Sequence, residues 1–385
     1  MRKVAVIGVG HGKFGVRSDA SLRELAFEAV KACLDDARLS LKEVDSIVTG
    51  VACDEFSFAV QPFTQINDYI GFHPKPNLRV EGACATGSLA LRTGWMNVAS
   101  GLADLVLVVG SEKMTEVSTS MATEIMGKAG DTIWEYPFGL SFPGYYALMA
   151  QAHMAEYGTT ERQMAMVAVK NHYYGARNPY AHIQKEIDVE KAVNAFTVAH
   201  PLKLYDCSLI TDGAAAVLLA SEDRAKVISP KPVWMVGLGL ATDACQMSER
   251  SSLTSLQGTR EAARIAYKMA GLGPGDVDVA SVHDCFTIAE ILAYEDLGFC
   301  ENGEGGRLIE SKETYIGGKI PVNVDGGLKA KGHPLGATGI SMAVEVTKQL
   351  RGEAAERQVK NAEVGLAHNV GGSGQVVTVH IFRRE

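Results

Sequence analysis

The chain has 385 residues, of which 46% are hydrophobic and 21% charged, a balance that excludes an intrinsically disordered protein. Its net charge of -8 argues against a nucleic-acid-binding protein, because neutralising phosphates requires clustered Lys and Arg. The length exceeds the usual size of one hydrophobic core, so we expect two packed halves or one duplicated domain.

The N-terminus and the cysteines bear on location. Residues 1–8 lack the length and the cleavage site of a signal peptide, and no apolar run is long enough to cross a membrane. None of the cysteines forms a CxxC pair, which predicts free thiols in a reducing cytoplasm and no metal site. There are seven: Cys33, Cys53, Cys84, Cys207, Cys245, Cys285 and Cys300.

Short apolar runs alternate with helical patterns along the chain, which predicts an α/β fold. The predicted strands are Val4–Val9, Ser46–Val51, Leu105–Val109, Ala214–Ala220, Val233–Leu240, Val279–His283, Val364–Ala367 and Val376–Phe382. The predicted helices are Leu22–Ala37, Ser88–Gly101, Glu161–Ala176, Thr259–Ala270 and Ile340–Leu350.

The chain contains an internal repeat. Residues 35–47 align without a gap with residues 268–280, and the tripeptide Ala-Thr-Gly opens a predicted helix in each half. We therefore predict two equivalent halves, residues 1–230 and 231–385. A stretch rich in Met, Tyr and Phe, at about 112–201, fits neither half and is interpreted as an insertion. It either covers a pocket or only packs against the core.

Cys84 lies at a predicted strand-to-helix turn. The partial positive charge at a helix N-terminus stabilises a thiolate. The small neighbours of Cys84 let a carbonyl group approach closely. This context predicts a nucleophile, and a buried structural cysteine is the alternative.

Three further segments carry groups that a nucleophilic thiol needs. His333 lies between glycines and a proline just before a helix, and a histidine of near-neutral pKa can take a thiol proton. His283 and Cys285 are two residues apart at a predicted strand end, so they face the same side. Asn369 precedes a glycine run, beginning at Gly371, whose backbone N–H groups can bind an oxyanion. Each segment alone is also compatible with a purely structural role.

Together these segments resemble the thiolase superfamily over essentially the whole chain. Thiolases carry an AC-x-[ST]-G-like segment, a GHP-x-G-x-[ST]-G segment and a C-terminal glycine-rich segment, and this chain has all three in that order. The HDCF sequence at 283–286 is similar to sterol-carrier-protein-type thiolases and their archaeal and bacterial relatives. The commonest thiolases have NEAF there and a second catalytic cysteine near the position of Asn369. The resemblance implies a five-layered αβαβα duplication with an inserted loop domain.

The resemblance also implies a role for each residue. Cys84 would carry the acyl group, His333 would deprotonate it, and Cys285 would be the second acid/base. The backbone N–H groups of Cys84 and Gly371 would bind one oxyanion, and His283 with His333 would bind the other. The residues expected in the substrate pocket are Asn369, Phe286 and Tyr145.

The implied reaction is thiolytic cleavage of a 3-oxoacyl-CoA, or the reverse condensation, with coenzyme A as co-substrate. The aromatic residues of the insertion favour a bulky or aromatic substrate such as benzoylsuccinyl-CoA. One alternative is an acetoacetyl-CoA thiolase that feeds hydroxymethylglutaryl-CoA synthase, and another is a CoA-linked retro-aldolase. A non-catalytic scaffold is disfavoured because the full set of reactive residues is present. The resemblance further implies a homodimer or tetramer with a small zinc-ribbon/OB-fold accessory subunit.

Overall fold

A computed structural model of the chain describes residues 1–384. One nine-stranded mixed sheet has the order β3-β2-β4-β7-β1-β8-β11-β10-β9, and β5 pairs with β6 separately. The strands are β1 (Val4–His11), β2 (Ser46–Gly50), β3 (Asn77–Val80), β4 (Leu105–Glu112), β5 (Thr197–Ala199), β6 (Leu202–Lys203), β7 (Gly213–Ser221), β8 (Val233–Thr242), β9 (Val279–Ser281), β10 (Val364–Gly371) and β11 (Val376–Arg384).

The two ends of this sheet repeat one topology. In the first half β3, β2 and β4 are parallel neighbours, and β7 and then β1 follow antiparallel. In the second half a parallel bridge between Ala280 and Val322 replaces the β2–β3 pairing. There β9 and β10 are parallel, and β11 and β8 follow antiparallel. The halves meet where β1 pairs with β8, so the structure has the duplicated α/β architecture that the sequence predicts.

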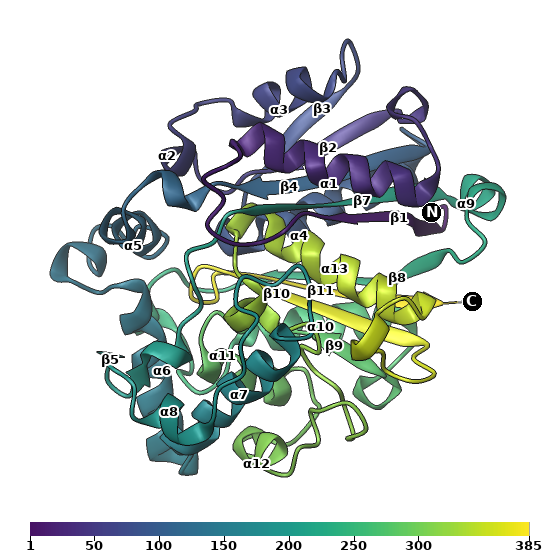
Figure 1. The fold of residues 1–385 in the computed structure, drawn as a ribbon. Coiled ribbons are helices and arrows are strands. Elements are labelled where there is room, and N and C mark those ends of the chain that lie inside the picture. The colour runs from purple at the N-terminus through teal and green to yellow at the C-terminus, as the bar shows by residue number, and fades with distance from the viewer. Residues whose placement is uncertain (385) are drawn as a thin grey trace.

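The helices and the two halves of the sheet form five layers: an outer helix layer, one half of the sheet, a central helix layer, the other half of the sheet and a second outer helix layer (Figure 1). Helices α4 (Thr86–Ser100) and α13 (Leu335–Arg351) pack on each other and on strands of the sheet, and together they form the central layer. Helix α1 (Leu22–Ala37) covers β1 and β7, and α10 (Gln257–Ala270) covers β8 and β11. The buried residues of α1 recur every three or four positions, the spacing of a helix that covers one face of a sheet.

Two aspartates of the sequence repeat make equivalent hydrogen bonds. Asp45 Oδ2 accepts from the backbone N–H groups of residues 104 and 105, both at 2.9 Å, where β4 begins. Asp278 Oδ2 accepts from those of residues 363 and 364, at 2.8 and 2.9 Å, where β10 begins. Because β4 and β10 occupy equivalent places in the sheet, the short sequence match reflects a repeated structural role.

The predicted helices are present, and α13 begins more than a turn before the start that its pattern predicts. Helix α13 begins at Leu335 rather than Ile340. Its first turn contains Gly336 and Gly339, which are poor helix formers, so packing against α4 stabilises this turn rather than intrinsic propensity.

The segment of about 112–201 folds mostly into helices beside the second half of the sheet (Figure 1). It contributes α5 (Thr119–Gly127), α6 (Phe142–Tyr157), α7 (Glu161–Gly175) and α8 (Val189–Val193), and α6 and α7 contact α11 (Thr287–Asp296). The remaining helices are α2 (Asp54–Ser57), α3 (Pro62–Ile70), α9 (Glu222–Ile228) and α12 (Gly305–Glu310). Among residues 1–384, no helix combines the length and apolarity needed to cross a membrane. The domain boundary near residue 230 stays a prediction.

Candidate active site

Cys84 lies in a tight turn between β3 and α4. The preceding Ala83 has a φ of 50°, a left-handed conformation that costs an L-residue about 1–2 kcal/mol. The backbone N–H of Ala85 donates to the Gly82 carbonyl at 3.0 Å, and the N–H of Gly82 donates to Thr86 Oγ1 at 2.9 Å. Strain of this kind persists where neighbouring contacts enforce it, and it is concentrated at functional sites.

The two Ala-Thr-Gly segments of the sequence meet at the crossing of α4 and α13. A Cβ on Gly87 would lie 2.8 Å from the Gly336 carbonyl oxygen and 2.9 Å from the Gly339 nitrogen. Only glycine therefore permits the first turns of these helices to approach so closely. Because Cys84 precedes α4 and His333 precedes α13, this crossing brings the two residues together.

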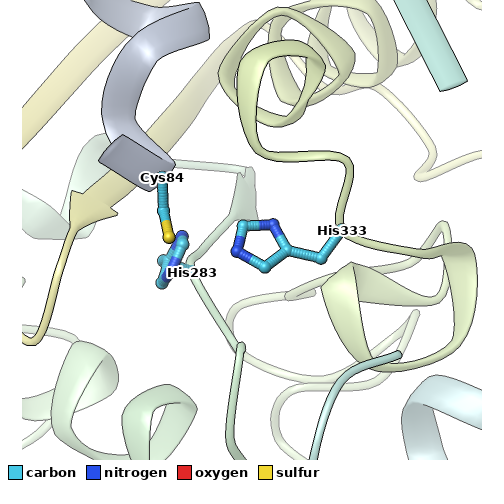
Figure 2. Close-up of side chains that lie close together, drawn as sticks. All are labelled: Cys84, His283 and His333. Atoms are coloured by element: carbon cyan, nitrogen blue, oxygen red, sulfur yellow. The ribbon is translucent and has the colours of Figure 1, made fainter. Parts of the chain in front are cut away.

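Cys84, His283 and His333 form one buried cluster (Figure 2). The sulfur of Cys84 and one ring nitrogen from each histidine lie within 4.8 Å of one another. The three side chains come from the turn before α4, the loop after β9 and the loop before α13. Cysteine and histidine are also zinc ligands, so the predicted absence of a metal site stays a prediction.

The hydrogen bonds of His333 leave a bare nitrogen facing this cluster. Thr338 Oγ1 donates to the Pro334 carbonyl at 2.9 Å, so its oxygen accepts from His333 Nδ1–H at 2.7 Å. A neutral imidazole with its proton on Nδ1 has a lone pair on Nε2. His333 Nε2 is buried and has no partner within the described residues, which is the arrangement of a base waiting for a proton.

His283 has the opposite tautomer. The side-chain amide of Asn369 donates from Nδ2 to His283 Nδ1 at 3.0 Å, which leaves the ring proton on Nε2. His283 Nε2 is buried and has no partner within the described residues. An unpaired N–H donor in a dry cluster is suited to stabilise negative charge that develops on a substrate oxygen.

Burial changes the resting protonation from the sequence-based expectation. A helix N-terminus predicts a stabilised thiolate, but burial raises the pKa of Cys84 to about 12. Burial also lowers the pKa of His333 to about 3, rather than leaving it near neutral. The cost of desolvating a charge exceeds the helix contribution here, so thiol and imidazole are both neutral at rest. The thiol proton must therefore move to His333 as the sulfur attacks.

The backbone amide beside the sulfur is that of Gly372. The backbone N–H groups of Cys84 and Gly371 stay predicted oxyanion donors. The N–H of Gly372 donates to Cys84 and offsets part of the effect of burial on the thiol pKa. Gly371 is still paired with Val376 in the β10–β11 ladder, and its Cα packs on the Gly82 carbonyl. Gly372 is the next residue of the glycine run, and its φ is positive at 61°.

Cys285 lies near the cluster but outside the group of three. Burial raises its pKa well above the usual value, and a hydrogen bond with Tyr146 offsets part of this rise. Phe286 stacks on the Tyr146 ring with centroids 4.7 Å apart. Strand β9 ends at Ser281, before the predicted His283, so these residues lie in a loop rather than on a strand end.

A cavity of about 210 Å³ opens beside Cys84. Its apolar walls come from the turn after β2, from α2, α5 and α6, and from the start of α13; they include Ala52, Phe56, Ile125, Met126, Phe142 and Leu335. The predicted Tyr145 is not among its lining residues. The Tyr145 hydroxyl instead donates to Glu135 at 2.8 Å, and Phe142, one turn earlier in α6, takes the place at the wall.

Two buried carboxylates that hold this site did not emerge as functional residues from the sequence. Glu112 Oε2 accepts from the N–H groups of Ala52 and Gly336 at 2.8 and 2.9 Å, and so joins two walls of the cavity. Asp284 accepts from the N–H groups of Leu328 and Lys329 at 2.6 and 3.1 Å. It thereby ties the loop of His283 to the segment before His333. The sequence signal that could have identified Asp284 is its position between two candidate catalytic residues, His283 and Cys285.

Family models match nearly the whole chain. The model of the thiolase N-terminal domain matches residues 4–223, and that of the thiolase C-terminal domain-like family matches residues 239–384. The chain belongs to the thiolase family. It is therefore an acyltransferase of the thiolase type, with coenzyme A as co-substrate, and it has the thiolase fold.

Individual relatives place this thiolase more closely. It is 48% identical to acetyl-CoA acetyltransferase of Methanothermobacter thermautotrophicus, with 100% of both chains covered. It is 36% identical to sterol carrier protein 2 of Bos taurus, over 97% of this chain and 71% of that protein. Among solved structures, the Ltp2-ChsH2(DUF35) aldolase aligns with a TM-score of 0.83 and 28% identity, covering 98% of this chain and 97% of that one.

Proposed function

We propose that this thiolase interconverts acetoacetyl-CoA and acetyl-CoA through an acyl group on Cys84. The full-length similarity to an acetyl-CoA acetyltransferase carries this proposal. The cavity beside Cys84 supports it, because a volume of about 210 Å³ bounded by bulky side chains suits a short acyl group better than an aromatic one. Both observations favour the short acyl chain over the bulky or aromatic chain that the insertion's composition favours.

In the cleavage direction, the sulfur of Cys84 attacks the C3 carbonyl of acetoacetyl-CoA while its proton moves to His333 Nε2. Breaking the C2–C3 bond leaves an acetyl thioester on Cys84 and the enolate of acetyl-CoA. The backbone N–H groups of Cys84 and Gly371 bind the first oxyanion, and that of Gly372 lies beside the sulfur. His283 donates from Nε2–H to the oxygen of the enolate.

Cys285 then gives its proton to C2 of the enolate. Burial suits it to this step, because a thiol of raised pKa stays protonated at neutral pH. Coenzyme A next attacks the acetyl thioester, and its thiol proton passes to the Cys285 thiolate. Cys84 leaves and regains its proton from His333, so both thiols return to their resting state. The reverse sequence is the Claisen condensation of two acetyl-CoA molecules.

The CoA-linked retro-aldolase is the second candidate, because the similar Ltp2-ChsH2(DUF35) complex is named an aldolase. The residues present favour acyl transfer. Cys84 lies within the His283–His333 cluster, and Cys285 is buried nearby with its own hydrogen-bond partner. A retro-aldol cleavage leaves no acyl group on the enzyme and needs no attacking thiol.

We propose that the chain forms a homodimer or tetramer and binds a small accessory subunit with an OB fold. The DUF35 chain in the named complex of a relative supports the second partner. Exposed apolar side chains on the loop before α6 offer a surface for contact: Ile133, Trp134 and Phe138 are 66%, 67% and 77% exposed. The zinc ribbon of that subunit and the cytoplasmic location stay predictions.

The substrate proposal is tested by supplying coenzyme A with acetoacetyl-CoA, 3-oxohexanoyl-CoA, benzoylsuccinyl-CoA and a 3-hydroxyacyl-CoA. We expect the highest kcat/KM for acetoacetyl-CoA and an added acetyl group on Cys84 by mass spectrometry of quenched enzyme. Faster cleavage of benzoylsuccinyl-CoA would show that the proposed substrate is wrong. Cleavage of the 3-hydroxyacyl-CoA without coenzyme A would show that the reaction is a retro-aldol cleavage.

A further inference from the structure

A chain of buried hydroxyl and amide groups extends from His283 to the central helix α4. Asn369 Nδ2 donates to His283 Nδ1 at 3.0 Å, and its Oδ1 faces Ser88 Oγ at 2.9 Å. Thr378 Oγ1 donates to Ser88 Oγ at 2.6 Å. All four side chains are at most 2% exposed. The chain thus links α4, β10, β11 and the loop after β9.

The hydrogen bonds observed here run in one direction along the chain of groups. Thr378 donates to Ser88 at 2.6 Å, with the Asn369 carbonyl farther away at 3.4 Å, and Ser88 donates to Asn369 Oδ1. The amide of Asn369 must then present Nδ2 to His283, and this leaves the imidazole proton on Nε2. A serine in the first turn of α4 therefore specifies which nitrogen of a distant histidine is protonated.

We infer that Ser88, supported by Thr378, is a positioning residue that holds His283 as the Nε2–H tautomer. This inference rests on the proposed role of His283 as an oxyanion donor. Neither hydroxyl belongs to the Cys84–His283–His333 cluster itself. Both act through Asn369, which supplies the hydrogen bond to His283 Nδ1. An alanine at position 369 would leave that nitrogen unpaired.

The alternative arrangement shows what Ser88 prevents. Ser88 Oγ also lies 2.9 Å from the Ala85 carbonyl, a second acceptor for its single proton. If the proton were given to Ala85, the Asn369 amide could turn over and donate to Ser88 Oγ. Its Oδ1 would then accept from His283 Nδ1–H, and a bare Nε2 would face the developing enolate. The donation from Thr378 occupies one of the two lone pairs of Ser88, so the turned amide would have only the other one to bind.

The test is Ser88→Ala, with Thr93→Ala as the matched control. Thr93 is on the same helix, but its hydroxyl bonds only the Leu89 carbonyl one turn earlier. We expect Ser88→Ala to lower kcat about tenfold to hundredfold, approaching the loss of one oxyanion donor, while KM is unchanged. Iodoacetamide should alkylate Cys84 at the wild-type rate, because His333 has its own support in Thr338. Thr93→Ala should leave kcat unchanged.

Nitrogen-15 NMR of histidine-labelled enzyme reads the tautomer directly and needs no substrate. We expect a protonated Nε2 for His283 in the wild type and a loss of that signal in Ser88→Ala. An unprotonated Nε2 in the wild type, or wild-type kcat in Ser88→Ala, would overturn the inference. If Ser88→Ala does not fold, Thr378→Val decides, because losing the Thr378 donation weakens the orientation of Ser88 and should lower kcat severalfold in the same way. If the enzyme proves to act on a different acyl substrate, the proposed function is wrong but the expected NMR result for His283 is unchanged.

Discussion

The imidazole rings of His283 and His333 meet edge to face, with centroids 5.1 Å apart and an interplanar angle of 81°. Their outer hydrogen bonds run in opposite directions: Asn369 donates to His283, whereas His333 donates to Thr338. Two neutral imidazoles of opposite tautomer therefore face one buried thiol. One is suited to accept a proton and the other to donate a hydrogen bond, which divides the work of general base and oxyanion donor between them.

Cys84→Ser should remove nearly all thiolysis of acetoacetyl-CoA. Serine is a far weaker nucleophile toward a ketone, and loss of a covalent nucleophile commonly costs more than about a thousandfold in kcat. The decay of acetoacetyl-CoA absorbance measures the rate. Cys207→Ser is the matched control, because Cys207 is another largely buried thiol outside the cluster of three. Full activity in Cys84→Ser would remove Cys84 from the mechanism.

The alkylation of Cys84 in the free enzyme should rise about tenfold per pH unit from pH 7 to 9.5, without a plateau. Burial raises the thiol pKa to about 12, so the reactive thiolate remains a small fraction throughout this range. Mass spectrometry after timed iodoacetamide treatment measures the rate at this residue. A plateau with a midpoint below pH 8 would show that the resting site already holds a thiolate.

Four buried histidines should each destabilise the enzyme as the pH falls below 6.5. Burial lowers their pKa to about 3: His11, His333, His368 and His380. Between pH 6.5 and 3 each of them binds a proton in the unfolded chain but not in the folded chain, so its contribution to stability rises with pH in this window. By pH 5 each of these histidines costs about 2 kcal/mol.

His380→Leu isolates one of these contributions. Both ring nitrogens of His380 are buried without a hydrogen-bond partner in the described residues, so leucine removes a proton acceptor and no bond. Urea unfolding should show that the variant loses less stability than the wild type between pH 7 and 5.

Met126→Ala should extend the substrate range to longer acyl chains. Met126 lines the cavity beside Cys84, and shortening it creates space for additional methylene groups. We expect kcat/KM for 3-oxohexanoyl-CoA to rise about tenfold relative to acetoacetyl-CoA, the scale of one methylene in an apolar pocket. Met121→Ala on the same helix is the control, because Met121 is 40% exposed and does not line the cavity. If the ratio of the two kcat/KM values is unchanged in Met126→Ala, the acyl chain does not bind in this cavity.

Asp284→Asn should impair both stability and turnover. Burial and the neighbouring Glu290 raise the pKa of Asp284 to about 8. Its side chain accepts from two backbone N–H groups and from Asn171, and each such bond contributes about 0.5–1.5 kcal/mol. Thermal unfolding and kcat should both fall, because the loops of His283 and His333 lose their shared clamp. Asp278→Asn is the matched control, as that carboxylate also accepts from two consecutive N–H groups, but at the start of β10. It should lower Tm without lowering kcat.

The sequence determined the layers and the candidates. Regular apolar periodicity placed the main strands and helices, and the aligned Asp45 and Asp278 indicated a duplication that the sheet order reproduces. Such features depend on neighbours in the chain, which is why pattern alone reveals them. Cys84 and His333 were also identified locally, because each lies in a glycine-rich turn before a helix.

Tertiary structure decided how these groups work. Whether Cys84 rests as thiol or thiolate depends on desolvation, which only the packed interior sets, and burial outweighs the helix N-terminus that the sequence displays. The amide beside the sulfur belongs to Gly372 because the β10 ladder still includes Gly371. The tautomer of His283 depends on Ser88, nearly 200 residues earlier in the chain, through hydrogen bonds that exist only after both halves have packed together.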